Sequence, residues 1–182
     1  MSKFIKIKLI AVMILVTLSI TFLTLSASAE EPKRGAMGQI APPFTGVDFD
    51  GNKFDLEEYY LKKPILVNFF SVHCVSCLTA VNILEKYRAK NNVTDEVPFV
   101  YVSLDDWKHR KSRVPPVWKK IFSKNQIRIN DGDRVIGTIF DVGTLPVTVI
   151  IDTDGKVTYR RDDYNLDFSK EIAKTLDSIL KK

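Results

Sequence analysis

The stretch Ile65-Leu66-Val67-Asn68-Phe69-Phe70, followed closely by Cys74-Val75-Ser76-Cys77, decides the fold. A near-continuous apolar run of this length is typical of a strand that is buried on both faces of a sheet. After the cysteines, apolar residues recur at helical spacing until Asn91-Asn92 ends the pattern. The sequence therefore predicts a buried strand that leads directly into a helix from about Cys74 to Lys90, with the cysteines at the junction.

Apolar runs on either side of this unit extend the prediction. Residues 98–104 form a second buried strand, so strand, helix and strand make one right-handed crossover with parallel strands. Upstream, Asp50-Gly51 lies between the short apolar runs of residues 44–54, and this dipeptide favours a hairpin because both positions tolerate positive φ. The order is thus a hairpin followed by a crossover unit.

The downstream part is predicted as an insertion, a second hairpin and a helix. Residues 105–130 are polar and irregular, with a short helix that starts near Pro115-Pro116. The remaining expected elements are a short helix over 133–140, a strand over 147–151, a tight turn at Asp154-Gly155, a returning strand over 156–160 and a terminal amphipathic helix from Phe168 with Asp167 as its cap.

Composition excludes several classes of protein. The chain has 182 residues, a net charge of +5 and 45% apolar residues, which argues against a disordered chain and against a multispanning membrane protein. The small charge excess also argues against a nucleic-acid partner. Two cysteines are too few for a disulfide scaffold or for a four-thiolate zinc site. Any chemical role of the cysteines must therefore follow from their position in the fold.

The first residues have the three parts of a secretory signal. Lys3, Lys6 and Lys8 precede an uncharged stretch over 9–25, and Ala27-Ser28-Ala29 provides a small-residue cleavage site. The alternative is an uncleaved membrane anchor, because the apolar core is just long enough to span a bilayer. Either way, we expect an exported domain, in the periplasm or at the outer face of the cytoplasmic membrane. Residues 1–29 are thus the signal, 30–39 a flexible leader and 40–182 the folded domain.

The position of the cysteine pair predicts its chemistry. A thiol in the first turn of a helix lies near unpaired backbone N–H groups and the positive end of the helix dipole, and both favour the thiolate. Three residues on, the chain has turned nearly once, so the second sulfur can form a disulfide with the first. We expect Cys74 to be the exposed nucleophile and Cys77 to resolve the mixed disulfide that Cys74 forms. This redox-active disulfide would require no further cofactor and no metal.

At this point the sequence resembles the thioredoxin-like superfamily, in particular the exported thiol-disulfide oxidoreductases of the cytochrome c maturation type. The resemblance covers most of the chain after the signal and rests on the following motifs: Ala41-Pro42-Pro43-Phe44, Asp50-Gly51-Asn52-Lys53-Phe54, Leu66-Val67-Asn68-Phe69-Phe70, Cys74-Val75-Ser76-Cys77, Gly143-Thr144-Leu145-Pro146-Val147-Thr148, Ile150-Ile151-Asp152 and Asp154-Gly155-Lys156.

The resemblance implies a thioredoxin fold, an α/β/α sandwich of three layers with an N-terminal β-hairpin extension and an insertion after the βαβ unit. It also implies that Pro146 is cis and lies against the disulfide, and that Leu145 offers backbone hydrogen bonds to the substrate. The implied partners are protein thiols and disulfides, apocytochrome c among them, and a membrane protein that donates electrons. The resemblance favours a reductant, whereas His73 leaves room for an oxidant or an isomerase.

Three positions depart from the family pattern. His73 stands where Trp is usual, and Ala80 and Asn82 stand where the cytochrome-linked subgroup often has Glu and Pro. The proton acceptor for Cys77 is therefore unassigned. His73 either stabilises the thiolate of Cys74 as an imidazolium or is a neutral surface residue. Val75 and Ser76 should tune the reduction potential, in a direction that the sequence does not reveal.

Three other interpretations of the cysteines remain. The pair could be an inert disulfide, although so short a loop contributes little stability. His73, Cys74 and Cys77 could instead bind Cu(I) or Zn, with His109 or a partner protein supplying the fourth ligand, which would make the chain a metal chaperone. A thioredoxin-fold peroxidase could use Ser71 in place of its threonine, but Val67 occupies the position of its proline. The cluster of positive charges over 108–113 is interpreted as a solvated surface.

Overall fold

The computed structural model describes residues 33–49, 51–93, 95–106, 120–122 and 126–181. The predicted export signal, the basic stretch with His109 and the expected helix start at Pro115-Pro116 lie outside the described residues. Among the residues that are described, no helix combines the length and the apolar character needed to cross a membrane.

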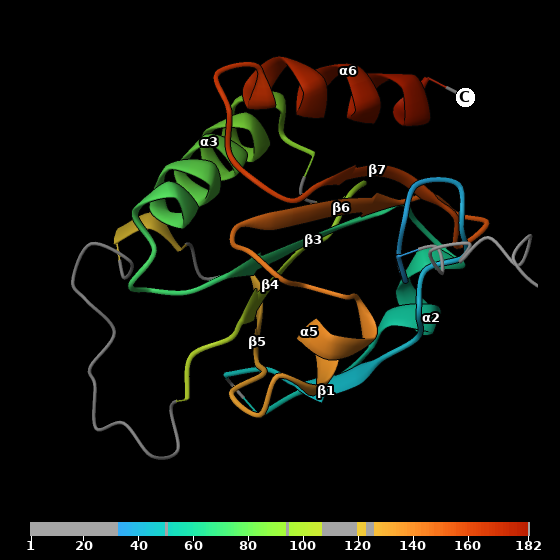
Figure 1. The fold of residues 1–182 in the computed structure, drawn as a ribbon. Coiled ribbons are helices and arrows are strands. Elements are labelled where there is room, and N and C mark those ends of the chain that lie inside the picture. The colour runs from blue at the N-terminus through green and yellow to red at the C-terminus, as the bar shows by residue number, and fades with distance from the viewer. Residues whose placement is uncertain (1–32, 50, 94, 107–119, 123–125, 182) are drawn as a thin grey trace, which may run out of the picture. The chain divides into compact units, whose positions relative to one another are not determined.

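A five-stranded sheet with the order β5-β4-β3-β6-β7 forms the centre of the domain (Figure 1). Strands β3 and β4 are parallel, as the crossover prediction requires, and β4 and β5 are also parallel. Strand β6 runs antiparallel to β3, and β7 is its hairpin partner. The strands span Ile65–Phe70 (β3), Phe99–Ser103 (β4), Ile127–Asn130 (β5), Val147–Ile151 (β6) and Val157–Arg161 (β7).

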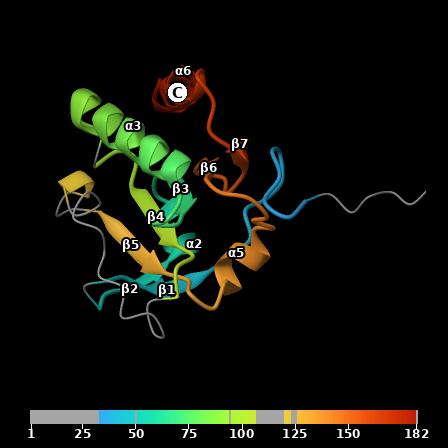
Figure 2. The same ribbon diagram turned by 60° about the vertical axis from the view of Figure 1, so that its left-hand side comes forward.

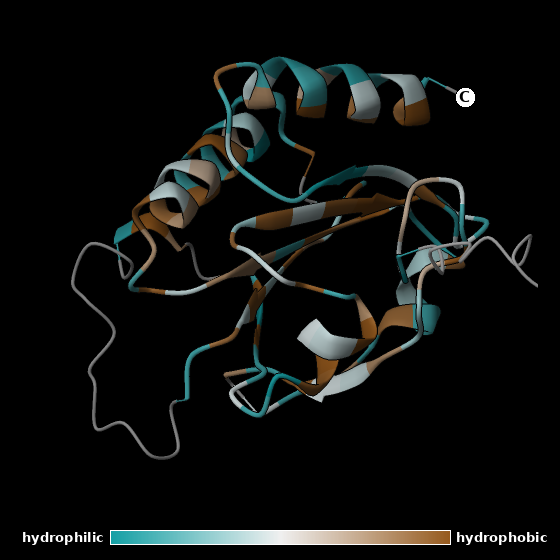
Figure 3. Ribbon diagram, viewed as in Figure 1, coloured by the Kyte–Doolittle hydropathy of each residue, from teal (hydrophilic) through white to brown (hydrophobic). Residues whose placement is uncertain are grey.

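Helices cover both faces of this sheet, which confirms the predicted three-layer fold. Helices α3 (Val75–Asn91) and α6 (Phe168–Leu180) lie on one face, and α2 (Leu56–Tyr60) and α5 (Val135–Ile139) on the other (Figures 1 and 2). Each face has its own apolar core, because alternate residues of β3 point to opposite sides. The side of α6 that faces the sheet is apolar and its outer side is hydrophilic (Figure 3).

The predicted N-terminal hairpin is present. Strands β1 (Thr45–Val47) and β2 (Lys53–Asp55) pair antiparallel as a separate small sheet, and Gly51 between them has a φ of 89°. Gly46 lies so close to β5 that a Cβ there would come within 2.9 Å of Ile129 Cγ2. The hairpin therefore packs against the edge of the main sheet through a position where a larger residue would clash.

The insertion contains a strand where we expected irregular chain. Residues 105–130 were interpreted as polar and irregular, but Ile127–Asn130 pairs with β4 as the edge strand β5. Its residues Ile127-Arg128-Ile129-Asn130 do alternate between apolar and polar, but over only four positions within a polar stretch, which is the shortest run that indicates a strand. Helix α2 lacks a clear pattern. It is a short helix capped by Asp55, whose side chain accepts a hydrogen bond from the Glu57 amide over 2.9 Å.

The folded domain begins earlier than Ile40. Instead of a flexible leader, residues 33–39 form backbone hydrogen bonds with β7: the Gly38 amide donates to the Val157 carbonyl, and the Val157 amide donates to the Gln39 carbonyl, both over 2.8 Å. Such main-chain pairing needs no apolar periodicity, so the sequence pattern does not reveal it. At the other end of the domain, Asp167 stands at the cap position of α6, but its side chain makes no capping hydrogen bond.

Candidate active site

Cys74 and Cys77 lie at the N-terminus of α3 and form a disulfide. Cys74 is the N-cap residue with an extended backbone, and Cys77 lies one turn inside the helix. The side chain of Cys74 is partly exposed, whereas Cys77 is fully buried. The buried strand β3 positions the pair, because its six residues are all buried and end just before the first cysteine. A partner molecule can therefore reach the sulfur of Cys74 and not that of Cys77.

Two donors point to the sulfur of Cys74. The backbone amide of Cys77 donates to Sγ of Cys74 over 3.1 Å, and the hydroxyl of Ser76 lies 3.3 Å from the same atom. In the reduced protein, both groups would favour a thiolate, because hydrogen bonds to the charged form stabilise it. The positive end of the α3 dipole acts in the same direction. Ser76 thus has a direct contact through which it can change the stability of the Cys74 thiolate.

The cis-proline loop lies against the cysteine pair. The peptide bond between Leu145 and Pro146 is cis, as the resemblance implied. The carbonyl oxygen of Leu145 lies 3.9 Å from Sγ of Cys74, although 71 residues separate the two in the sequence. The fold thus brings three of the predicted site residues, Cys74, Leu145 and Pro146, to one place.

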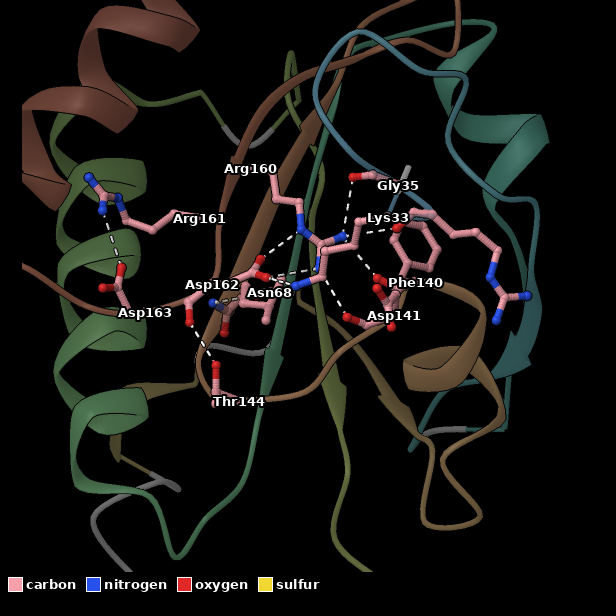
Figure 4. Close-up of polar contacts among 12 residues, drawn as sticks. Lys33, Gly35, Asn68, Phe140, Asp141, Thr144, Arg160, Arg161, Asp162 and Asp163 are labelled. Atoms are coloured by element: carbon pink, nitrogen blue, oxygen red, sulfur yellow. Dashed lines mark hydrogen bonds and ion pairs between the residues drawn. The ribbon is translucent and has the colours of Figure 1, made fainter. Parts of the chain in front are cut away.

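A buried arginine that the sequence analysis missed supports this loop (Figure 4). The guanidinium of Arg160 donates to the carbonyl of Phe140 over 2.8 Å and to the carboxylate of Asp162 over 2.6 Å. The backbone carbonyl of Asp162 accepts a hydrogen bond from the Thr144 hydroxyl over 3.0 Å, directly before Leu145. Arg160 thereby connects the end of β7 to the start of the connection that carries the cis proline, and the Asp162 carbonyl holds Thr144 near the other end.

Comparisons with known proteins agree with this geometry. The sequence profile of the Redoxin family matches residues 36–176. The chain belongs to the redoxin family. A thiol-disulfide oxidoreductase ResA of Bacillus cereus is 30% identical over 126 residues, which are 66% of each chain. The match thus spans slightly less than two thirds of the length of this relative.

Two further similar proteins align with a larger part of this redoxin than the Bacillus cereus protein does. A thiol:disulfide interchange protein DsbE of Yersinia pestis is 25% identical over 164 residues, which cover 87% of this chain and 83% of the relative. The solution structure of a thiol:disulfide interchange protein from a Bacteroides species superimposes with a TM-score of 0.59 at 24% identity, over 78% of this chain and 91% of the other. The predicted membership of the thioredoxin superfamily and the predicted thioredoxin fold are confirmed.

The two remaining predicted residues of this redoxin, His73 and Val75, lie at the surface. Val75 is 80% exposed. His73 is also exposed, and its backbone amide donates to the Ser71 hydroxyl oxygen over 3.2 Å. Within the described residues, the imidazole of His73 makes no hydrogen bond. Its influence on Cys74 therefore stays a prediction.

Asn68 is a buried polar residue of the central strand, on the α3 side of the sheet. Its amide nitrogen donates to the Thr148 hydroxyl over 2.8 Å, whereas its Oδ1 has no hydrogen-bond partner in the part of the chain that the structure describes.

A carboxylate that the sequence analysis missed lies further along α3. Glu85 is buried and accepts hydrogen bonds from Arg88 over 2.7 Å and from the Tyr101 hydroxyl over 2.6 Å. Burial, followed by the charge of Glu85, raises the pKa of Tyr101 well above its ordinary value, so this hydroxyl stays protonated and donates. Ala80, which replaces the acid of the cytochrome-linked subgroup, is also buried. Glu85 is thus already paired within its own network, and the proton acceptor for Cys77 stays unassigned.

No observation within the described residues supports the interpretation of the cysteines as metal ligands. Among the described residues, no group of three or more His, Cys, Asp or Glu side chains is placed to hold a metal ion. His109, one candidate for the fourth ligand, lies outside them.

A second carboxylate that the sequence analysis missed lies beside the link between β3 and the cysteines. Asp105 follows β4 and accepts hydrogen bonds from the Ser71 hydroxyl over 2.6 Å and from the Val72 amide over 2.9 Å. One signal could have revealed it, because parallel neighbouring strands end at the same edge of a sheet, so residues just after β3 and β4 come together.

Proposed function

We propose that this redoxin is a thiol-disulfide oxidoreductase that exchanges disulfides with exported proteins through Cys74 and Cys77. One observation carries the proposal: a partly exposed sulfur at a helix N-terminus accepts a backbone N–H and is bonded to a fully buried sulfur one turn further on. An inert disulfide would not need an exposed sulfur with two donors. The names of the relatives, thiol-disulfide oxidoreductase and thiol:disulfide interchange protein, support the same activity.

The proposed reaction is two successive thiol-disulfide exchanges. The Cys74 thiolate attacks one sulfur of a substrate disulfide, and the other substrate sulfur leaves as a thiolate and takes up a proton. Cys77 then loses its proton and attacks Sγ of Cys74, which releases the second substrate sulfur as a thiolate that takes up a proton in turn. The substrate gains two electrons and two protons, and the cysteine pair becomes the disulfide. No further cofactor takes part in this scheme. The backbone of Leu145 and the ring of Pro146 would align the substrate chain beside Cys74.

The direction, location and partners belong to the same proposal. The N-terminal basic, apolar and small-residue segments support export to the periplasm or to the outer face of the cytoplasmic membrane. There the pair would act as a reductant, reloaded by a membrane protein that donates electrons. Apocytochrome c is the proposed substrate, supported by the similarity to ResA and DsbE. Ala80 and Asn82 weigh against it, since the cytochrome-linked subgroup often has Glu and Pro there.

The test combines an activity assay with a trap. The wild-type chain should accelerate the reduction of insulin disulfides by dithiothreitol. In cells, Cys77→Ser should accumulate mixed disulfides with substrates, because Cys74 still attacks and nothing releases the product. Cys74→Ser is the matched control and should trap none. Equal trapping by both variants, or by neither, would contradict the assigned roles.

A metal titration separates the enzyme from a metal chaperone. The reduced protein would be titrated with Cu(I) and with Zn(II) while free thiols are counted. Tight stoichiometric binding without insulin reduction would replace the proposed activity. Weak binding together with insulin reduction would support it.

A further inference from the structure

The carboxylate of Asp105 holds the chain that leads into the cysteine pair. Its Oδ1 accepts from the Ser71 hydroxyl over 2.6 Å, and its Oδ2 accepts from the Val72 amide over 2.9 Å. Hydrogen bonds to an ionised acceptor are about twice as strong as neutral ones. A single side chain from the end of β4 therefore fixes two consecutive residues of this link.

Ser71 connects Asp105 to Cys74 through its own hydrogen bonds. Its hydroxyl oxygen accepts from the His73 amide over 3.2 Å, and its carbonyl accepts from the Cys74 amide over 3.2 Å. The turn over residues 71–74 is thus built on Ser71, and Ser71 is held by Asp105. The position of Cys74 as the cap of α3 depends on this chain of bonds.

Asp105 is itself held in place from the other side. The Ser103 hydroxyl donates to its Oδ2 over 2.8 Å, and the carbonyl of Ser103 accepts from the Asp131 amide over 2.8 Å. Gly132 lies so close that a Cβ there would be 3.0 Å from the Asp105 carbonyl oxygen. The Ser103 hydroxyl thus holds the carboxylate, and the close approach of Gly132 confines the backbone that carries it.

The charge of Asp105 opposes the donors that act on Cys74. The Val72 amide nitrogen lies 2.9 Å from the carboxylate, and two residues of chain span at most about 7 Å, so the backbone nitrogen of Cys74 lies within about 10 Å of the charge, roughly one Debye length at ordinary ionic strength. A nearby negative charge disfavours a thiolate, whereas the α3 N-terminus and the Cys77 amide favour it. A less stable thiolate in the reduced protein makes the pair more reducing.

We infer that Asp105 is a positioning residue that anchors residues 71–73, between β3 and Cys74, through its hydrogen bond with Ser71. Its negative charge destabilises the thiolate form of Cys74, and this keeps the cysteine pair a reductant. This inference rests on the proposed function, because it assigns a cause to the proposed direction. Asp105 touches no reacting atom and acts only through the Ser71–Cys74 turn and through its field.

Two substitutions should change the alkylation rate of the Cys74 sulfur in opposite directions. Asp105→Asn keeps the shape and an acceptor but removes the charge, so Cys74 should be alkylated about threefold faster at a pH below its pKa. The equilibrium constant with glutathione should shift by a similar factor toward a more oxidising disulfide. Ser71→Ala keeps the charge and removes the donor that partly neutralises it, so alkylation should become slower. Ser71→Thr retains the hydroxyl and should behave as the wild type.

The control places the same loss of charge elsewhere. Asp154→Asn lies in the turn after β6, at the opposite end of that strand from Pro146, and should leave the alkylation rate unchanged. Thermal unfolding of each full-length variant would establish that it is folded. An unchanged rate in Asp105→Asn, or shifts of the same sign in Asp105→Asn and Ser71→Ala, would overturn the inference. A wild-type protein that reduces no insulin would instead overturn the proposed function.

Discussion

The backbone amide of Cys77 donates a hydrogen bond to Sγ of Cys74 over 3.1 Å, within the first turn of α3. The same two residues are joined by the disulfide, and only Cys74 is accessible. The covalent partner of the reactive sulfur is therefore also its nearest backbone donor. When the disulfide opens, this amide remains beside the sulfur and can stabilise the negative charge that develops there.

Ser76 should increase the reactivity of Cys74. Its hydroxyl lies 3.3 Å from Sγ, so Ser76→Ala removes a donor and should raise the pKa of Cys74. We expect alkylation by iodoacetamide to be about threefold slower at a pH below that pKa. Thr79→Val is the matched control, because the Thr79 hydroxyl bonds to the Val75 carbonyl on the same helix and not to a sulfur. Equal slowing in both variants would rule out a specific role of Ser76.

His73 can be tested by restoring the residue usual in the family. If its imidazolium favours the thiolate, His73→Trp should make the disulfide less oxidising, as measured by equilibration with glutathione. Val75→Ala changes another exposed residue beside Cys74 without any change in charge and should leave the equilibrium unaltered. An unchanged equilibrium in His73→Trp would make His73 an ordinary surface residue.

Arg160 should contribute strongly to the stability of the domain. Its side chain is only 7% exposed and bonds to Asp162 and to the carbonyls of Arg34, Gly35, Phe140 and Asp141 (Figure 4). Arg160→Met should lower the free energy of unfolding in urea by about 3 kcal/mol, because acceptors of a buried charge are left without their donor. Arg161→Met, whose side chain is 25% exposed, should cost about 1 kcal/mol or less. Similar costs for both variants would argue against a central role of Arg160.

Arg160 should also make the free energy of unfolding depend on pH under acidic conditions. Burial acts to raise the pKa of Asp162, but hydrogen bonds from Arg160 and Lys33 outweigh it, and the net pKa is lowered. A carboxyl with a depressed folded-state pKa stabilises the fold above its unfolded pKa of about 3.9, and this stability is lost as the pH falls through the folded value.

The urea titration should therefore be repeated between pH 6 and pH 2. The difference in unfolding free energy between the wild type and Arg160→Met should become smaller below about pH 4. Asp163→Asn serves as the control, since that carboxylate is 67% exposed and should contribute little to this change. A difference that stays constant over the whole range would show that the charge of Asp162 is not involved.

Elements with strong local patterns could be predicted from the sequence. The apolar run of β3 and the helical spacing of α3 gave bounds within a residue of those observed. Strand β5 was not predicted because its apolar and polar alternation extends over only four residues, and the pairing of Gly38 and Gln39 with β7 was not predicted because main-chain bonds to a distant strand leave no apolar periodicity. The same reason explains why Arg160 and Asp105 were missed. Most of their partners are distant in the sequence, and a single charged residue at the end of a strand or just after one carries no pattern.

The sequence by itself determined that two cysteines stand where a buried strand passes into a helix, because helix capping and the helix dipole act over a few neighbouring residues. Only the tertiary structure decided that the carbonyl of Leu145 lies 3.9 Å from the first sulfur and that Asp105 holds the turn before it. These contacts join strands that pair across the sheet, and their geometry depends on register and packing rather than on local propensity.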